Sequence, residues 1–456
     1  MPYLCNIAYV LLLLAASPWI LYQKLARGKY REGFAAKFWG AAPVRTGNRP
    51  CIWLHAVSVG EVNLLSVLLK EIAKHRPEVE CVVSTTTKTG YDLAKQKYAN
   101  HTVFYCPLDF SWSVRRAMRR IRPSLLLLAE LELWPNLIRA AKEHGAGVAI
   151  VNGRLSEKSF RGYFRWRRLL KPILNRLDLV AAQNEEYAER FRAIGVAAGK
   201  VQVTGSLKFD GAQSDRNNPR TKQLRELAGI QSGDIVFLAG STQAPEEQLA
   251  LAAFQSLAAD HPRLKLVIVP RHPHRFDEVA AMLAQSGLPW RRRSELAAVG
   301  DGGRQTALLA PPFTAGSVEP PKVLLVDTVG ELGAWWGTAT IGFVGGSLYS
   351  SRGGQNMIEP AAYGVAVSFG PNTQNFRDVV AMLLDANAAV RVNSGDELTA
   401  FVRRALDNAN FAAELGRNAV ALVGKQQGAT ARTWQRLESL LSATREHWPQ
   451  QIRPAA

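Results

Sequence analysis

The stretch CIWLHAVSVGEVNLL, residues 51–65, contains the two local signals that decide the fold. Its apolar first part, CIWLHAVS, is typical of a buried strand. Ser58 and Glu61 then form the serine-x-x-glutamate pattern of a capping box, and an apolar run follows at once. The stretch therefore predicts a strand, a short polar turn and an amphipathic helix that extends from Val62 to His75.

This strand-turn-helix unit recurs along most of the chain. Apolar segments from VECVVSTTT to VQVTGSLKF alternate with helix-compatible segments, which predicts a parallel sheet covered on both faces. A polar, proline-containing segment predicts a linker at 213–230, and a second series begins at DIVFLAGS. We expect an α/β protein with two doubly wound, Rossmann-like domains, 39–212 and 231–425, facing a cleft, and a helical segment at 426–456.

The composition restricts the binding partners more than it restricts the fold. The 456 residues carry a net charge of +18, which suits polyanions such as nucleic acid, anionic lipid headgroups or phosphorylated substrates. The four cysteines lack metal-ligand spacing, and the last three are expected to be buried and reduced. No Asp-x-Asp triplet occurs, which argues against enzymes that hold a divalent ion with such aspartates. We expect no metal and no cofactor.

The N-terminus has the pattern of a membrane anchor. No charged side chain occurs from Met1 to Gln23, and basic residues follow at Lys24, Arg27, Lys29 and Arg31. By the positive-inside rule, this order keeps the rest of the chain in the cytoplasm. We therefore expect residues 1–38 to form a signal-anchor and a juxtamembrane basic segment, with a buried helix as the alternative.

Charged residues at strand ends are the candidates for chemistry in the first domain. Glu61 is either a helix cap only or also a general base in the mouth of the cleft. Glu130 and Glu132 end a long apolar strand, and a buried carboxylate needs a partner or access to the cleft. Lys208 also follows a strand and is a candidate partner or phosphate contact, although a structural ion pair explains the same pattern.

The second domain has the features of a nucleotide-binding domain without a Walker or dinucleotide motif. In GGSLYSSRGGQNMIEPAAYG, Gly345 and Gly346 allow close approach of the backbone to a ligand, and Glu359 is placed to accept a ribose hydroxyl. Arg271 and His272 directly follow a strand, and arginine suits a phosphate. A glycine-rich turn and a solvated loop are the alternatives. A long insertion is expected at 291–322.

Two basic segments interleave aromatic and cationic residues in the first domain. VRRAMRRIR spans 114–122, and FRGYFRWRRLLKP spans 160–172. Helices of this composition lie well on an anionic membrane surface, whereas nucleic acid could use the same residues. Tethering by an anchor favours lipid.

Nine segments in order resemble the 3-deoxy-D-manno-octulosonic acid (Kdo) transferases of lipopolysaccharide biosynthesis. They are WLHAVSVGE, ELELWPN, GSLKFD, AGST, PRHPHRF, DTVGEL, FVGGSL, GGQNMIEPAAYG and GPNTQNF. The resemblance implies a GT-B glycosyltransferase of the inner membrane that moves Kdo from CMP-Kdo to a lipid A precursor (lipid IVA). It implies inversion at the anomeric carbon, no metal in the transfer step and no nucleic-acid partner.

The same resemblance assigns roles to residues. It implies that Glu61 is the general base and that Glu130 and Lys208 support the transition state. It implies CMP contacts from two groups of residues in the second domain: Arg271, His272, Val329, Gly330 and Glu331, and Asn356, Met357, Ile358 and Glu359. Gly240 and Ser241 are expected to contact the donor phosphate.

Two residues depart from the family pattern, Met357 in place of proline and Ser206 in place of asparagine. Two other functions fit parts of the sequence: a GT-B transferase that uses a UDP-sugar at the membrane, and a membrane-tethered nucleic-acid-binding protein.

Overall fold

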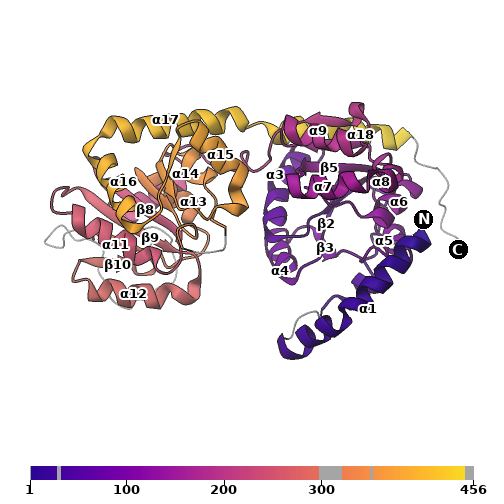
Figure 1. The fold of residues 1–456 in the computed structure, drawn as a ribbon, viewed down its shortest axis with the longest axis horizontal. Coiled ribbons are helices and arrows are strands. Elements are labelled where there is room, and N and C mark those ends of the chain that lie inside the picture. Colours follow the sequence, from indigo (N-terminus) through magenta and orange to yellow (C-terminus); the bar gives the residue numbers. More distant parts are fainter. Residues whose placement is uncertain (1, 28–31, 297–320, 350–352, 447–456) are drawn as a thin grey trace. The chain divides into compact units, whose positions relative to one another are not determined.

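The chain forms two compact units in a computed structural model that describes residues 2–27, 32–296, 321–349 and 353–446. Unit 1 comprises Met1–Gly211 and Gln426–Ala456, and unit 2 comprises Ala212–Lys425 (Figure 1). Within the described residues, each unit has a seven-stranded parallel sheet. The expectation of two α/β units with parallel sheets is confirmed.

The sheet of unit 1 has the order β3-β2-β1-β4-β5-β6-β7. Its strands are β1 (Cys51–His55), β2 (Glu80–Thr85), β3 (Thr102–Tyr105), β4 (Leu125–Ala129), β5 (Gly147–Gly153), β6 (Leu179–Ala182) and β7 (Val201–Val203). β1 has β2 on one side and β4 on the other, with His55 opposite Ser84 and Leu128. The strand order therefore reverses beside β1, and ligands of open α/β sheets bind at such a point.

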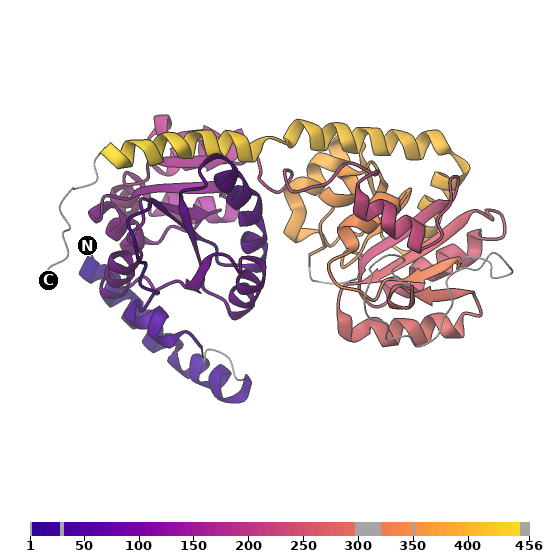
Figure 2. The same ribbon diagram turned by 180° about the vertical axis from the view of Figure 1, so that it is seen from behind.

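Helices cover both faces of this sheet. The described helices of unit 1 are α1 (Pro2–Arg27), α2 (Phe34–Trp39), α3 (Val59–His75), α4 (Lys88–Lys97), α5 (Ser111–Ile121), α6 (Pro135–Glu143), α7 (Glu157–Arg165), α8 (Arg167–Leu174), α9 (Glu185–Ile194) and α18 (Ala429–Glu446). Side chains of α5, α6 and α9 form one core layer with the sheet, and those of α3, α4 and α18 form the other. Figure 2 shows the last helix, α18, lying on unit 1.

Helix α1 is attached to unit 1 by polar contacts near its N-terminus. Asn6 exchanges hydrogen bonds with Ser111, and the Tyr9 hydroxyl donates to Asp109 at 3.0 Å. The other end of α1 projects away from the rest of the unit (Figure 1). No helix in the described part of the chain is long and apolar enough to cross a membrane. The spanning anchor expected within residues 1–38 is therefore not supported, and Lys29 and Arg31 lie outside the described residues.

The sheet of unit 2 has the order β10-β11-β9-β8-β12-β13-β14. Its strands are β8 (Ile235–Thr242), β9 (Leu264–Pro270), β10 (Trp290–Arg292), β11 (Val323–Leu325), β12 (Ile341–Val344), β13 (Ala366–Phe369) and β14 (Ala389–Arg391). β8 lies between β9 and β12, so the strand order reverses between β8 and β12. The carboxyl ends of these two strands are where a ligand of this unit is expected.

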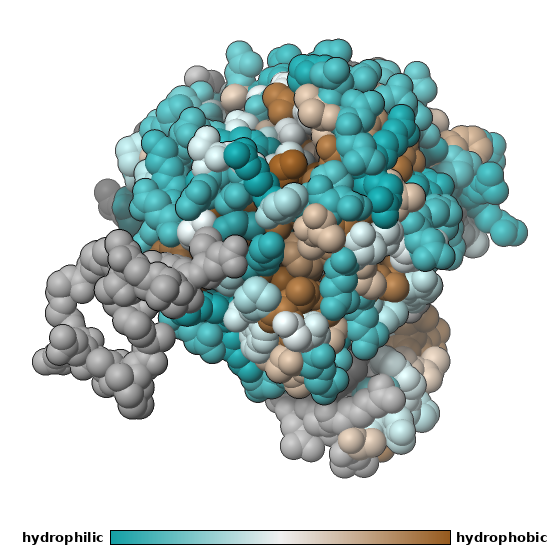
Figure 3. Space-filling view, turned by 90° about the vertical axis from the view of Figure 1, so that its left-hand side faces the viewer, coloured by the Kyte–Doolittle hydropathy of each residue, from teal (hydrophilic) through white to brown (hydrophobic). Residues whose placement is uncertain are grey.

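The described helices of unit 2 are α10 (Pro219–Leu227), α11 (Glu246–Leu257), α12 (Phe276–Gln285), α13 (Leu332–Trp335), α14 (Ile358–Ala362), α15 (Arg377–Asp385), α16 (Gly395–Asp407) and α17 (Ala409–Gln426). α10 falls inside the segment expected to be a linker, 213–230. It packs on unit 2 because the Thr221 hydroxyl donates to the Ala334 carbonyl and Arg216 donates to Tyr363 and Ala339. The side of unit 2 visible in Figure 3 is mainly hydrophilic, with smaller apolar patches. Most of the expected 291–322 insertion, 297–320, lies outside the described residues.

Candidate active site

Glu61 lies at the carboxyl end of β1, in the first turn of α3. The Ser58 hydroxyl accepts from the Glu61 amide at 3.3 Å and donates to one carboxylate oxygen of Glu61 at 2.7 Å. The amide of Val57 donates to the other oxygen at 2.9 Å. The serine half of the predicted capping box is present, whereas the Glu61 carboxylate accepts from the amide of Val57, one residue before the N-cap. Both carboxylate oxygens are held in one orientation.

The surroundings of Glu61 make its carboxylate a stronger base than an exposed one. Burial raises its pKa above the ordinary glutamate value, and the nearby charge of Glu130 raises it further. The hydrogen bonds from Val57 and Ser58 act in the opposite direction without cancelling the burial. A carboxylate with a raised pKa accepts a proton more readily near neutral pH, which is the property a general base needs.

Glu130 and Lys208 meet at the carboxyl end of β4. The Lys208 Nζ lies 3.6 Å from the Glu130 Oε1, and both side chains are half-buried. Glu130 has a left-handed backbone with φ +55°, and its amide donates to the Val151 carbonyl at 2.9 Å. Left-handed backbone is uncommon for a residue other than glycine and is concentrated at functional sites. The ion pair allowed by the sequence therefore exists, in a strained and half-buried setting.

Glu132 is the third carboxylate of this group. The indole N–H of Trp134 donates to it at 2.7 Å. Burial raises its pKa to about 7, and the charges of Glu61 and Glu130 add to this effect. Because the charge of Glu130 raises the pKa of Glu61 and the charges of Glu61 and Glu130 raise that of Glu132, the three carboxylates form one electrostatic cluster. We call this group the carboxylate cluster.

His55 supports the carboxylate cluster and was not a candidate in the sequence. Its ring is fully buried, which lowers its pKa to about 4, and Nδ1 lies 2.9 Å from the Ser84 hydroxyl. Its ring centroid lies 6.4 Å from that of Trp134 in an edge-to-face arrangement, so a neutral imidazole backs the indole that holds Glu132. In the sequence, His55 is visible only as a histidine at the end of an apolar strand. This pattern is too common to indicate a functional residue.

In unit 2, three of the expected CMP-binding residues lie near one another. The Asn356 side chain donates to Glu359 at 3.0 Å and accepts from the Ile358 amide at 3.0 Å. Burial raises the pKa of Glu359, whereas the Asn356 bond and the charge of Arg271 act in the opposite direction. Arg271 is exposed and follows β9, and its backbone amide donates to the Thr242 carbonyl. This arrangement provides a cation, an amide and a carboxylate at one edge of the sheet.

Other expected CMP residues have different surroundings. Met357 and Ile358 are buried in the core, so only their backbone is available to a ligand, whereas Val329 is 77% exposed. Gly330 has φ +89°, in the region that favours glycine. His272 stacks on His274, with ring centroids 5.3 Å apart.

Glu331 is held by two arginines. Arg293 donates to it twice at 3.0 Å, Arg220 forms a short ion pair with it, and the Thr328 hydroxyl donates at 2.6 Å. Burial alone raises the pKa of Glu331, but these donors outweigh burial and keep the pKa below its usual range.

The glycine-rich turn after β12 is occupied by a carboxylate of the same chain. Glu246 is 1% exposed and accepts from the amides of Gln243, Gly346, Ser347 and Leu348 at 2.7 to 3.0 Å. The amides of Gly346–Leu348 are therefore satisfied internally. From the sequence, the backbone at Gly345 and Gly346 is expected to approach a ligand, but the amides of this turn donate to Glu246 instead. We call this arrangement the Glu246 clip.

Gly240 has a structural reason for its identity. A Cβ at Gly240 would lie 2.5 Å from the Trp336 ring, so only glycine fits beneath this indole. Ser241 is 7% exposed and has φ +55°. The packing of Trp336 explains the glycine without a phosphate contact.

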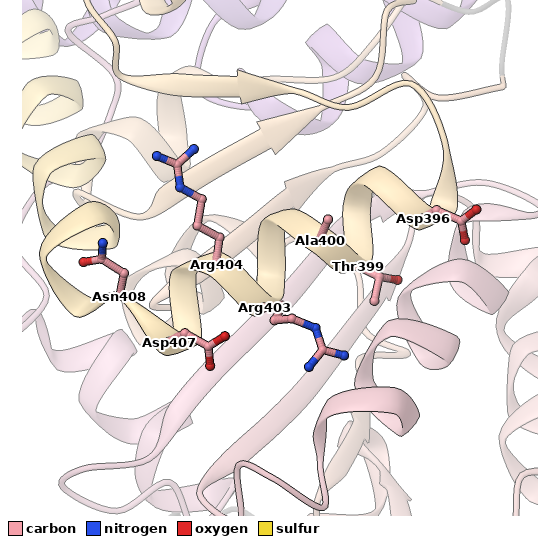
Figure 4. A pocket seen from close by; sticks show the side chains of 7 residues that line it. All are labelled: Asp396, Thr399, Ala400, Arg403, Arg404, Asp407 and Asn408. Carbon is pink, nitrogen blue, oxygen red and sulfur yellow. The ribbon is translucent and has the colours of Figure 1, made fainter.

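A shallow pocket of about 540 Å³ lies elsewhere on unit 2, along α16 (Figure 4). Its lining residues come from one helix and its C-cap: Asp396, Thr399, Ala400, Arg403, Arg404, Asp407 and Asn408. None of them belongs to the expected CMP site, so this surface does not locate the chemistry.

Two doubly wound units, with the carboxylate cluster at the reversal point of one sheet and the Arg271–Glu359 group in the other unit, define the GT-B class of glycosyltransferases and their fold relatives. Consistent with this class, the crystal structure of UDP-GlcNAc 2-epimerase from Neisseria meningitidis has a TM-score of 0.55 with this protein. It is 12% identical and covers 85% of this chain and 100% of that chain, so it supports the fold alone.

The family follows from the sequence comparisons. Residues 28–211 match the model of the 3-deoxy-D-manno-octulosonic-acid transferase (Kdo transferase) family. The transferase of Haemophilus influenzae is 31% identical over 93% of this chain and 96% of its own length. That of Bordetella pertussis is 32% identical over 95% of this chain and 99% of its own length. The chain belongs to the Kdo transferase family and is a glycosyltransferase.

Proposed function

We propose that this enzyme transfers Kdo from CMP-Kdo to a sugar hydroxyl of a lipid A precursor such as lipid IVA, with inversion and without a metal. The observation that carries the proposal is the orientation of Glu61, whose carboxylate is held by Ser58 and Val57 and whose pKa is raised by burial. A carboxylate held in one orientation and with a raised pKa is fitted to remove a proton.

The chemistry follows from this base. Glu61 accepts the proton of the acceptor hydroxyl while the hydroxyl oxygen attacks the anomeric carbon of Kdo. The bond from that carbon to the phosphate oxygen breaks, and CMP leaves with the electron pair. A single displacement inverts the anomeric configuration. The Lys208 and Glu130 pair and the Arg271 guanidinium are the polar groups that stabilise developing charge on the acceptor and on the leaving phosphate.

Unit 2 supplies the groups for the donor nucleotide. The Arg271 guanidinium suits the phosphate of the nucleotide. The Asn356 amide and the Glu359 carboxylate are suited to hydrogen bonds with the ribose hydroxyls and the edge of the base. A GT-B transferase that uses a UDP-sugar is the competing proposal, because the same residue types bind any nucleoside phosphate.

The test is transfer from CMP-Kdo to lipid IVA in the presence of a chelator, with CMP and UDP as competing ligands. The proposal expects transfer in chelator, inhibition by CMP and not by UDP, and a product of inverted configuration by nuclear magnetic resonance. Inhibition by UDP alone, or transfer that needs an added divalent ion, would contradict it.

We further infer that unit 1 lies on the anionic cytoplasmic surface of the inner membrane. Large apolar side chains are exposed on three neighbouring helices: Ile7, Leu11, Leu12, Leu14 and Trp19 on α1, Phe34 and Trp39 on α2, and Trp112 on α5. Arg115, Arg116 and Arg119 are exposed on α5 beside them. Apolar side chains flanked by cations are typical of helices that lie in a membrane interface.

The second basic segment contributes less of its aromatic surface than the sequence indicated. Phe160 and Tyr163 pack against the core of unit 1, whereas Trp166 and Leu169 are exposed. Co-sedimentation with vesicles tests the inference. We expect binding to vesicles rich in phosphatidylglycerol that weakens with salt, and weaker binding to neutral vesicles. Equal binding to both kinds would contradict a role for the arginines, and preferential binding of duplex DNA would favour the nucleic-acid alternative.

A further inference from the structure

The loop that carries Lys208 is also the segment at which the chain leaves unit 1. This loop, 204–211, begins after β7 and ends where the chain passes to unit 2, between Gly211 and Ala212. The chain returns between Lys425 and Gln426 and then begins α18.

Asp210 joins the outgoing and returning segments directly. One oxygen of its carboxylate accepts from the Gly428 amide at 2.6 Å, and the other accepts from the Thr430 amide in a short hydrogen bond. These amides belong to the start of α18, whose N–H groups have no partner within the helix. The negative charge of Asp210 is also favourable at this end of the helix dipole. A carboxylate from a residue 218 positions away therefore caps α18.

A second set of contacts holds the same junction. The Arg432 Nε donates to the Thr204 carbonyl at 2.9 Å, and its Nη1 donates to the Gln427 carbonyl at 3.2 Å. The Thr433 hydroxyl donates to that of Thr204 at 2.9 Å. Both ends of the 204–211 loop are thus attached to the first two turns of α18.

These contacts between the 204–211 loop and α18 are connected to the carboxylate cluster in two ways. Leu207, Leu64 of α3 and Ala429 of α18 form a small buried cluster, so α18 packs on the helix whose first turn contains Glu61. The Leu207 amide also donates to the side chain of Asn152 at 3.0 Å, and Asn152 is fully buried with φ +54°. The loop is therefore held on both sides of Lys208, by Asn152 before it and by Asp210 after it.

We propose that Asp210 is a positioning residue that fixes Lys208 against Glu130 by tying its loop to α18. Asp210 itself lies one residue before the outgoing crossing, and Gly428 lies two residues after the returning one. The Asp210 contacts therefore lie between Lys208 and both segments that pass from one unit to the other. A displacement of either segment would change the Asp210 contacts before it changed the position of Lys208. The effect on rate rests on the proposed function, whereas the attachment of the loop does not.

The test compares Asp210→Asn and Arg432→Met with the control Asp178→Asn. Asparagine has one acceptor and would direct an NH₂ at the second amide, so one of the two bonds is lost. Asp178 is a matched control because its carboxylate also accepts from a backbone amide, Val148, and from Lys142. It lies at the amino end of β6, at the opposite edge of the sheet from the carboxylate cluster.

We expect amide exchange in 204–211 and 427–433 to rise roughly tenfold or more in both junction variants, the factor for losing a hydrogen bond to a charged group. We expect kcat to fall by about tenfold with the KM for CMP-Kdo nearly unchanged, because an alignment is lost and donor binding is not. Asp178→Asn should lower the melting temperature alone.

Three outcomes overturn the proposal. They are unchanged exchange in 204–211 in the junction variants, an equal loss of kcat in Asp178→Asn, and raised exchange with wild-type kcat. If the wild-type protein transfers no Kdo, the proposed function fails, and the exchange measurements still decide whether Asp210 holds the loop. Because Arg432→Met leaves Asp210 intact, a folding defect specific to Asp210→Asn cannot imitate the shared result.

Discussion

Replacing Glu61 by glutamine separates the two roles that this residue combines, helix cap and base. Glutamine keeps the shape of the side chain. Its amide oxygen can accept from the Val57 amide, and its NH₂ can donate to the Ser58 hydroxyl. Both hydrogen bonds of the side chain therefore survive, but the group can no longer accept a proton at neutral pH.

The two effects have very different magnitudes. Losing a general base costs about 10²- to 10⁴-fold in kcat, which corresponds to roughly 2.7–5.5 kcal/mol of activation free energy. Exchanging two charge-assisted hydrogen bonds for neutral ones costs about 1 kcal/mol of unfolding free energy. Part of that cost is offset because the variant no longer buries a carboxylate whose pKa burial has raised.

The dependence on pH provides a second measurement. Since the pKa of Glu61 is raised in the folded protein, its contribution to stability is present at low pH and is lost as the pH rises through the folded pKa. Relative to wild type, the variant should therefore be more stable at about pH 8 than at about pH 4. Transfer from CMP-Kdo and thermal melts at both pH values form the assay. Transfer near the wild-type rate would refute the role of Glu61 as base, and lost transfer with a large fall in melting temperature at pH 8 would return it to a structural cap.

Three further predictions follow from the surroundings of single residues. Glu132→Gln should flatten the stability curve of the wild type, because a carboxyl group with a pKa of about 7 contributes stability at acidic pH and loses it as the pH rises through 7; melts from pH 5 to 8 that keep the wild-type slope would contradict this. Glu246→Ala should destabilise unit 2 by about 3 kcal/mol or more, because four buried amides lose their acceptor; urea unfolding should show a smaller loss for Glu246→Gln, and equal losses would argue against the clip. Gly240→Ala should cost about 1–3 kcal/mol through overlap with Trp336; wild-type stability with lost CMP binding, measured by calorimetry, would instead support a phosphate contact.

Local patterns predicted local structure well. The cap that the Ser58 hydroxyl places on the Glu61 amide joins residues only three apart, and an apolar run such as LLLLA is a buried strand wherever it lies in a parallel sheet. The Glu130–Lys208 pair was within reach because Glu130 directly follows β4, Lys208 lies in the loop after β7, and the carboxyl ends of parallel strands share one edge.

Contacts between distant segments could not be predicted in this way. Gly345 and Gly346 were expected to let the backbone approach a ligand, because the acceptor of the Gly346 amide, Glu246, lies one hundred residues earlier in the chain. The same limit applies to the hydrogen bonds that hold α1, because the partners of Asn6 and Tyr9 lie 100 or more residues away. Exposure is also a tertiary property, and the helical segment that contains Phe160 and Trp166 turns one of these rings into the core and the other outward.

The position of α18 affects how the protein is made on the ribosome. Trp434, Leu437 and Leu441 complete a core layer whose other residues lie between Ile52 and Leu179. Synthesis of unit 1 therefore begins before that of unit 2 and is completed after it, since α18 follows the whole of unit 2 in the chain. A fragment that ends at residue 425 would leave these core side chains uncovered, whereas 212–425 is continuous in the chain and can close during translation. Synthesis of α18, rather than of the N-terminal half of the chain, is thus the event that allows the helix carrying Glu61 to reach its final packing.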